Sequence, residues 1–382
     1  MSNSDERYAE ALKLHENDRI TDAEHAYRKI LSVDPEHTES LHMLGVAIAQ
    51  LGRVNEGIKL IRDSVERERD NSIYQSNLGE ALRQIGKIDD AIIAFRNAIE
   101  RNSDNFDATH SLAVLLAERG KNKEAIDLAR RATELRPSNA TAHISFGQIL
   151  MHNEDSVGAM KAVTRALEIV PNYEKALNLQ GLILREKGLY EDAILSFEAG
   201  LRTRPSSNAN RLNLAVSLTA LQRYDKAIET YEEYLRRAPN KPIAYIGLGQ
   251  VHRLQKKYLA SEQRLLEGLK LFPRFRALHC ELGLTYIIMG RVKDAGEHLQ
   301  AAARGDDALP DAIIAYGKYL LQIGHLPEAK TQFENVLKKQ STNKEAKDGL
   351  RQARGEMSIN VKWSLDSDFP PPVSKKNNNS TS

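Results

Sequence analysis

A period of 34 residues constrains this chain more than any other feature of its sequence. The segment from Ser72 to Ser103 reads SIYQSNLGEALRQIGKIDDAIIAFRNAIERNS, and its pattern of small and apolar residues returns every 34 residues. Ten copies run from Ser4 to Asn343 without an insertion or deletion. Position 8 is Gly or Ala in every copy, and position 20 is Ala, Gly or Ser. This regularity predicts a solenoid, in which each repeat packs on its neighbours and the core grows along one axis.

Each repeat carries the pattern of two amphipathic helices. Apolar residues at positions 7, 8 and 11, and again at 20, 24 and 27, follow helical spacing. Small residues at positions 8 and 20 let the two helices cross closely, while position 24 supplies bulk, as in Phe95 and Phe197. Helix-ending residues recur in register: Gly52, Gly86, Gly120, Gly188, Gly290 and Gly324 within repeats, and Pro35, Pro137, Pro171, Pro205, Pro239 and Pro273 at their ends. The predicted fold class is therefore all-α.

The ends of the chain depart from the period. We predict three regions: a ten-repeat solenoid over residues 4–343, a capping helix over 344–355 and an extended or disordered tail over 356–382. The tail holds the only tryptophan, Trp363, followed by three consecutive prolines and a run rich in Asn and Ser. Such a composition cannot bury a core of its own.

Charge and composition exclude several classes of function. The chain has 54 basic and 52 acidic side chains and a net charge of +2, which provides no field for nucleic acid. It has no run of 18 apolar residues and no apolar signal segment at its start, so we expect a cytoplasmic protein without membrane insertion. The single cysteine, Cys280, excludes an internal disulfide framework and a thiolate-rich zinc site.

No catalytic pattern occurs in the sequence. Phosphate-binding glycine loops, dinucleotide-binding fingerprints, H-E-x-x-H and G-x-S-x-G are all absent. The eleven histidines are scattered among the repeats without metal-ligand spacing. We therefore predict a protein that is not an enzyme, with no catalytic residues, no metal site and no cofactor.

The repeats resemble the tetratricopeptide repeat family over Ser4 to Asn343. The resemblance implies a right-handed superhelix of about ten helix-turn-helix units with a concave groove. The segment from Leu41 to Ala98 looks like the repeats of bacterial proteins of this family and of the arm of O-linked N-acetylglucosamine transferases. The asparagine ladder of that arm is represented at position 6 only by Asn77 and Asn213, and no transferase domain follows. The pattern that binds C-terminal carboxylates in chaperone adaptors matches no three consecutive repeats.

In this family the first helix of each repeat lines the groove, with positions 2, 5, 9 and 12 pointing inward. Carried over to this chain, together with position 6, these positions imply a partner-binding set: Asn77, Glu80, Arg83, His110, Gln148, Lys175, Asn178, Arg185, Asn213, Gln250 and Arg253. The later repeats place apolar residues at the same positions: Leu212, Val216, Ile243, Ile246, Leu284, Ile287, Ile314 and Leu321. We call these eight residues the apolar half, and two interpretations of it are possible. It forms pockets for a partner, or it packs between repeats or under the chain's own tail with Trp363 and Phe369.

Three functions fit these features. The first is a non-enzymatic scaffold or adaptor that binds a protein or peptide segment along the groove, with Asn and Gln side chains contacting its main chain. The second is a substrate-recruiting or regulatory subunit of a separate glycosyltransferase or other transferase. The third is a structural scaffold that assembles with further copies of itself as a homo-oligomer.

Overall fold

The computed structural model describes residues 3–305 and 307–363 of the 382 in the chain. These residues form α-helices joined by short turns, and no strand occurs among them, which confirms the predicted all-α fold class. The first eleven helices are α1 (Asn3–Glu16), α2 (Ile20–Val33), α3 (Thr38–Gln50), α4 (Val54–Arg67), α5 (Ser72–Gln84), α6 (Ile88–Arg101), α7 (Phe106–Glu118), α8 (Asn122–Leu135), α9 (Ala140–His152), α10 (Ser156–Ile169) and α11 (Glu174–Glu186). They are followed by α12 (Tyr190–Thr203), α13 (Asn208–Ala220), α14 (Tyr224–Arg237), α15 (Pro242–Leu254), α16 (Tyr258–Leu271), α17 (Arg276–Ile288), α18 (Val292–Ala303), α19 (Pro310–Gln322), α20 (Leu326–Lys339) and α21 (Lys344–Ala353).

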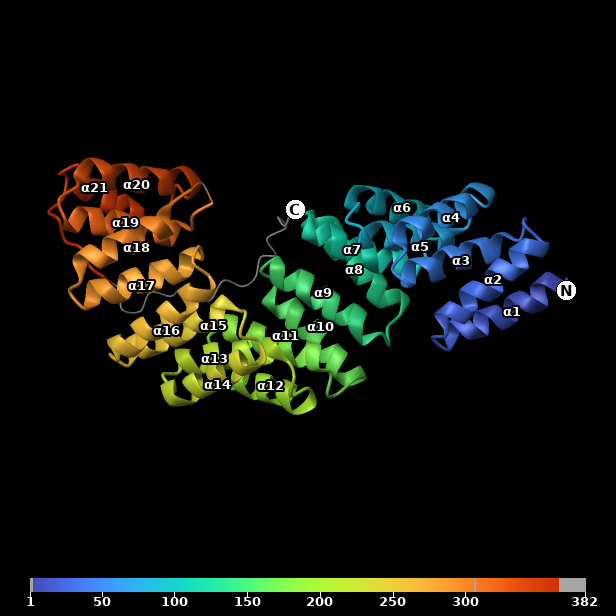
Figure 1. Ribbon diagram of the computed structural model, residues 1–382, viewed down its shortest axis with the longest axis horizontal. Coiled ribbons are helices and arrows are strands. Elements are labelled where there is room, and N and C mark those ends of the chain that lie inside the picture. The colour runs from blue at the N-terminus through green and yellow to red at the C-terminus, as the bar shows by residue number, and fades with distance from the viewer. Residues whose placement is uncertain (1–2, 306, 364–382) are drawn as a thin grey trace. The chain divides into compact units, whose positions relative to one another are not determined.

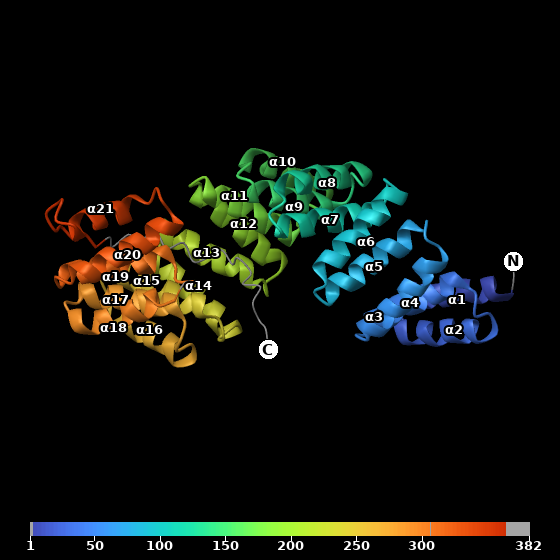
Figure 2. The same ribbon diagram turned by 90° about the horizontal axis from the view of Figure 1, so that it is seen from above.

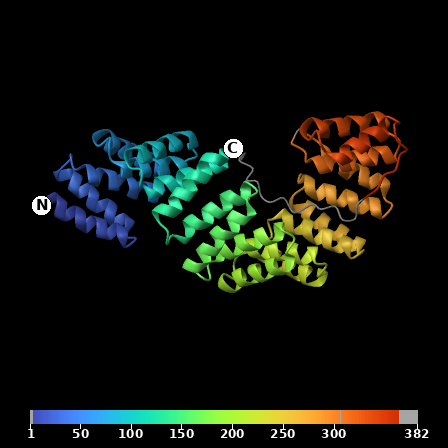
Figure 3. The same ribbon diagram turned by 180° about the vertical axis from the view of Figure 1, so that it is seen from behind.

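The helices divide into two compact bodies. The N-terminal body is Met1–Leu179 and the C-terminal body is Gln180–Ser382, so the boundary lies within α11. The odd-numbered helices from α1 to α9 in one body, and from α13 to α19 in the other, each pack against the even-numbered helix that follows (Figures 1 and 2). The view from behind shows the same succession, from blue to green in one body and from yellow to red in the other (Figure 3). The core is accordingly a series of small clusters, each shared by neighbouring helices.

The turn between the two helices of a repeat has one fixed conformation. Position 15 has a left-handed backbone in all ten repeats, with φ between 72° and 88° at the six glycines that occupy it. The other four repeats adopt the same conformation without glycine, at Asp18 (58°), Glu154 (63°), Gln222 (57°) and Lys256 (60°). Glycine is favoured here because it has no Cβ to clash in this region. The sequence therefore predicted the turn correctly, and the structure extends it to the repeats that lack glycine.

Close approach between helices explains the small residues at position 8. A methyl group added at Gly79 would lie 2.7 Å from a ring carbon of Phe95, which is the position 24 residue of the same repeat. Gly317 stands in the same relation to Phe333, at 2.9 Å. The Phe333 ring also lies against Gly349 of α21, so a single side chain packs against glycines of two helices. The bulky residue at position 24 thus fills the space that the glycine leaves open.

Side-chain caps fix where several first helices begin. Asn71, Asn105 and Asn139 each precede a first helix and accept a hydrogen bond from a backbone N–H of its first turn. Asn105 also donates to the carbonyl of Ser72, the first residue of α5, at 3.2 Å. Because these three caps occupy the same position of successive repeats, α5, α7 and α9 start in register.

We predict that Gly79→Ala destabilises the N-terminal body by about 1–3 kcal/mol, because overpacking against Phe95 outweighs the gain of about 1 kcal/mol in helix propensity. Gly147→Ala is the matched control, since the nearest atom to a methyl group there would be 3.3 Å away. Urea unfolding followed by circular dichroism measures both. Equal stability of the two variants would contradict the assignment of Gly79 as a site of close helix contact.

Candidate binding surface

The predicted partner-binding residues of the N-terminal body are partly used to join neighbouring repeats. Asn77 at position 6 of α5 lies 2.9 Å from Nε2 of His42 at position 5 of α3. The His42 ring is almost fully buried and stacks on Tyr74 with 4.1 Å between ring centroids. Its Nδ1 lies 3.2 Å from Oγ of Ser64, whose hydroxyl donates to the Ile61 carbonyl. These contacts fit a neutral His42 that donates through Nδ1 and accepts from Asn77 through Nε2.

His110 repeats this arrangement two repeats later along the chain. Its Nε2 lies 2.9 Å from Oγ of Ser145, again from position 5 of one first helix to position 6 of the next. The imidazole stacks on Phe106 at 5.7 Å between centroids, and burial lowers its pKa. Each of the two histidines therefore links one first helix to the next through its side chain.

In the C-terminal body an arginine, whose side chain is longer, links two adjacent first helices. Arg185 at position 12 of α11 donates to the Asn213 side chain at position 6 of α13, at 3.0 Å. Burial lowers the pKa of Arg185, because removal from water disfavours the charged guanidinium. The guanidinium and the amide are thus engaged with each other on the inner face.

Gln250 and Arg253 belong to a buried network that the sequence analysis missed. Both are on α15 and both bond to Glu281 of α17, Gln250 at 2.8 Å and Arg253 at 3.1 Å. Arg253 and Glu281 are each only 2% exposed. Because Arg253 precedes Glu281 by the same 28 residues that separate Arg185 from Asn213, the repeat register contains a signal for this pairing.

The remaining predicted residues present polar groups at the surface. Glu80 and Arg83 are one turn apart on α5 and bond to each other, with Arg83 Nε at 2.9 Å from a Glu80 oxygen. Gln148 on α9 and Lys175 on α11 are exposed, and Asn178 is half-buried. We call Glu80, Arg83, Gln148 and Lys175 the polar surface of the N-terminal body.

Residues of the apolar half lie largely inside the C-terminal body. Ile246, Leu284, Ile314 and Leu321 are buried. The other members, Leu212, Val216, Ile243 and Ile287, are half-buried. This burial favours the reading in which the apolar half packs between repeats and under the tail. Phe369, which was assigned to the same role as Trp363, lies outside the described residues.

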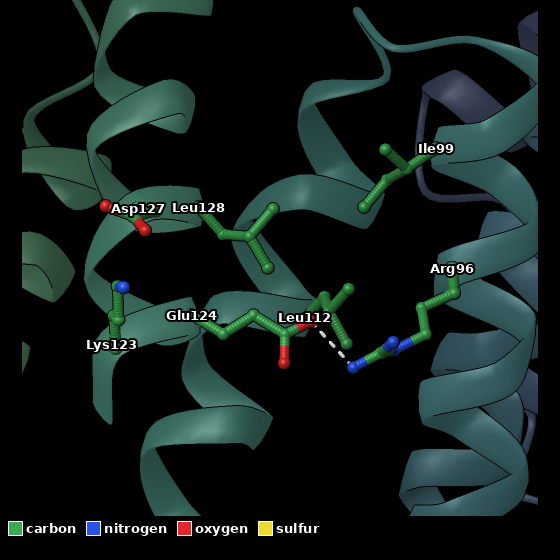
Figure 4. Close-up of a pocket in the computed structure, with 7 residues that line it drawn as sticks. All are labelled: Arg96, Ile99, Leu112, Lys123, Glu124, Asp127 and Leu128. Carbon is green, nitrogen blue, oxygen red and sulfur yellow. Dashed lines mark hydrogen bonds and ion pairs between the residues drawn. The ribbon is translucent and has the colours of Figure 1, made fainter. Parts of the chain in front are cut away.

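Two clefts are lined mainly by residues of second helices. The first has a volume of about 540 Å³ and lies between α6, α7 and α8, with Leu112 at its base and Arg96 bonded to Glu124 across it at 2.6 Å (Figure 4). The second, of about 680 Å³, lies on α16 to α18 and includes His279 and His298, whose Nδ1 atoms are 2.8 Å apart. No serine, threonine or cysteine is among the residues that line either cleft.

Within residues 3–305 and 307–363, no cluster of three or more His, Cys, Asp or Glu side chains has the arrangement to hold a metal ion. No helix in the same ranges is both long and apolar enough to cross a membrane.

Helix pairs of constant length, closed by a constant turn and packed through glycine, define an α-solenoid of helix-turn-helix repeats. Two solved structures share this fold. The crystal structure of yeast Tom70 has a TM-score of 0.55 and 13% identity, covering 93% of this chain and 89% of that one. A tetratricopeptide repeat protein from Parabacteroides merdae has a TM-score of 0.55 and 18% identity, covering 65% of this chain and 98% of that one.

The chain belongs to the tetratricopeptide repeat family. The family model matches residues 8–73, 76–140, 112–174, 152–208, 178–242 and 212–263, which together make up more than half of the sequence. A TPR repeat-containing protein from Methanocaldococcus jannaschii is 26% identical over 159 residues, or 40% of this chain and 27% of that protein. The chain therefore matches little more than a quarter of that relative's length. Family membership supports a role as a protein-interaction scaffold.

We predict that the N-terminal body loses stability as the pH falls, through His42. Burial lowers the pKa of His42 to about 4. The unfolded state binds the proton first, so the folded state is favoured above the ordinary histidine pKa and loses this advantage as the pH falls from about 6.5 toward about 4. Between about pH 7.5 and about pH 5, the wild-type chain should lose about 2 kcal/mol more than His42→Gln. Urea unfolding at a series of pH values measures both proteins. If the unfolding free energies of the wild-type chain and His42→Gln change equally with pH, His42 is not a buried neutral histidine.

We also predict that Glu281→Gln destabilises the C-terminal body by about 3–5 kcal/mol, because it leaves the buried Arg253 cation without its anion. Replacing both partners, in Arg253→Met/Glu281→Leu, should restore most of the loss. Glu191→Gln provides the control, since its pair with Arg223 is solvent-exposed and should be worth less than about 1 kcal/mol. If Glu281→Gln lowers the unfolding free energy as little as the control does, the buried pair does not stabilise the C-terminal body. Urea unfolding compares all of these variants.

Proposed function

We propose that this protein is a non-enzymatic scaffold that binds an extended polypeptide segment along the first helices of its N-terminal body. The observation that carries the proposal is the polar surface of Glu80, Arg83, Gln148 and Lys175. Arg83, Gln148 and Lys175 are exposed and the Glu80 side chain is 39% exposed, whereas the inner-face residues His42 and His110 are occupied by contacts between repeats. The four residues of the polar surface come from α5, α9 and α11, so a segment that meets all four has to cross several repeats.

The chemistry of this surface fits a segment with accessible main-chain groups and both kinds of charge. Gln148 has an amide that donates and accepts, which suits the main chain of an extended peptide. Lys175 provides a positive charge for an acidic side chain, and the exposed Glu80–Arg83 pair can exchange its internal bond for bonds to a partner. An extended partner loses conformational entropy on binding, which keeps the affinity moderate.

The alternative functions remain predictions. A substrate-recruiting or regulatory subunit of a transferase would use the same surface for a different partner, and a self-assembling scaffold would use another copy of the chain. No contact within the described ranges favours either of them over the first.

A phage-displayed library of random peptides, selected on the full chain, tests the proposal. Selected peptides should bind Arg83→Ala/Gln148→Ala/Lys175→Ala at least about tenfold more weakly, a loss of about 1.4 kcal/mol. Arg130→Ala/Lys161→Ala is the matched control, because it removes two positive charges from exposed positions on the second helices α8 and α10. Fluorescence anisotropy of a labelled peptide measures each affinity.

Selection of no peptide, or equal binding to the wild-type chain and the triple variant, would rule out peptide binding at the polar surface. A similar loss in the control variant would show that the effect comes from net charge and would also reject this site.

A further inference from the structure

A short segment after the last helix stays attached to the C-terminal body. It runs from α21 past α19 toward α17, as the red coil in Figure 1 shows. The backbone N–H of Asn360 donates to the side chain of Gln352 in α21, at 2.8 Å. Val361 packs against a buried cluster that includes Ile314, Leu321 and Phe333. The segment is thus held by both polar and apolar contacts although it is not helical.

Trp363 makes the most specific of these contacts. Its indole Nε1 donates to the side-chain oxygen of Gln322 at the end of α19, at 2.9 Å. An indole has only this one donor, so the hydrogen bond satisfies its whole polar requirement. The ring packs against a second cluster, which contains buried Leu284 and Ala312 and half-buried Ile287 and Tyr316. The ring is therefore held on its apolar face and at its polar edge.

The segment alternates in the way an extended peptide does. Val361 and Trp363 are half-buried, whereas Lys362 between them is exposed. In an extended chain, residues two apart point to the same side, so Val361 and Trp363 can contact the helices together while Lys362 faces solvent. Met357 and Ile359, earlier in the segment, are 39% and 49% exposed and do not share this burial. The contacts thus define a minimal pattern of an aliphatic residue, any residue and tryptophan.

We propose that the surface formed by α17 and α19 is a binding site for an extended segment with this aliphatic-x-tryptophan pattern, and that Val361 to Trp363 occupies it in cis. The site is separate from the polar surface of the N-terminal body and does not depend on the function proposed for it. A partner with the same pattern has to displace the chain's own segment. The effective concentration of a short tethered segment is on the order of millimolar, so this competition strongly weakens the partner's apparent affinity.

The single tryptophan allows the cis contact to be tested in the full-length chain. The fluorescence of the wild-type chain should be blue-shifted relative to the urea-unfolded chain and protected from acrylamide quenching. Gln322→Ala should shift the emission to the red and raise quenching, since it removes the acceptor of the indole N–H. Emission and quenching equal to those of the unfolded chain would overturn the proposal. A dependence of the emission on protein concentration would also overturn it, because it would place the segment in a second copy.

A second experiment tests the site with a peptide added in trans. The probe is a fluorescein-labelled peptide with the sequence of residues 357–363, MSINVKW. It should bind full-length Trp363→Ala at least tenfold more tightly than the wild-type chain, since that variant no longer fills the site. Binding to Trp363→Phe, which keeps an aromatic ring in place, should lie between the two.

The controls separate this site from a general affinity for apolar peptides. A peptide with alanine in place of both Val361 and Trp363 should not bind Trp363→Ala, and adding Gln322→Ala to that variant should weaken binding of the original peptide severalfold. Circular dichroism verifies that all variants remain helical. Equal affinity of the original peptide for the wild-type chain and for folded Trp363→Ala would overturn the proposal.

Discussion

The structure depends on one contact, in which a bulky side chain at position 24 of a repeat enters the space left by a small residue at position 8. Phe95 against Gly79 and Phe333 against Gly317 are clear examples. The contact fixes how closely the two helices of a repeat approach, and the second helix then packs on the next repeat. Gly349 receives the Phe333 ring in the same way, so α21 docks by an extension of the same rule.

Polar residues on the first helices serve two purposes that look identical in the sequence. His42, His110, Arg185 and Arg253 join one first helix to the next, whereas Gln148 and Lys175 reach the surface. A buried polar group is costly unless it is hydrogen-bonded, so the joining residues have to find partners within the protein. The exposed residues carry no such requirement, which leaves them available for recognition.

The repeat period was sufficient to predict the all-α fold, the helix pairs and the turn positions, because these depend on contacts within 34 residues of sequence. Whether an individual inner-face residue contacts the neighbouring repeat or stays exposed was harder to predict. Arg253 was assigned to partner binding, and its bond to Glu281 emerges only when the two first helices lie side by side. The separation of 28 residues recurs between Arg185 and Asn213, so comparing adjacent repeats would have revealed part of this pattern. The contact of Trp363 with Gln322 has no such periodic signal, because the segment lies outside the repeats.

The turns within repeats differ in backbone strain, because four of the ten lack glycine. Asp18 and Glu154 in the N-terminal body, and Gln222 and Lys256 in the C-terminal body, hold a left-handed backbone that side chains disfavour. Such a conformation costs on the order of 1 kcal/mol and persists only because the flanking helices enforce it. Thermal fluctuations should therefore open these four turns more readily than the six glycine turns. The distribution of glycine along the array is thus one factor in where a protease or an unfolding force gains access to the chain.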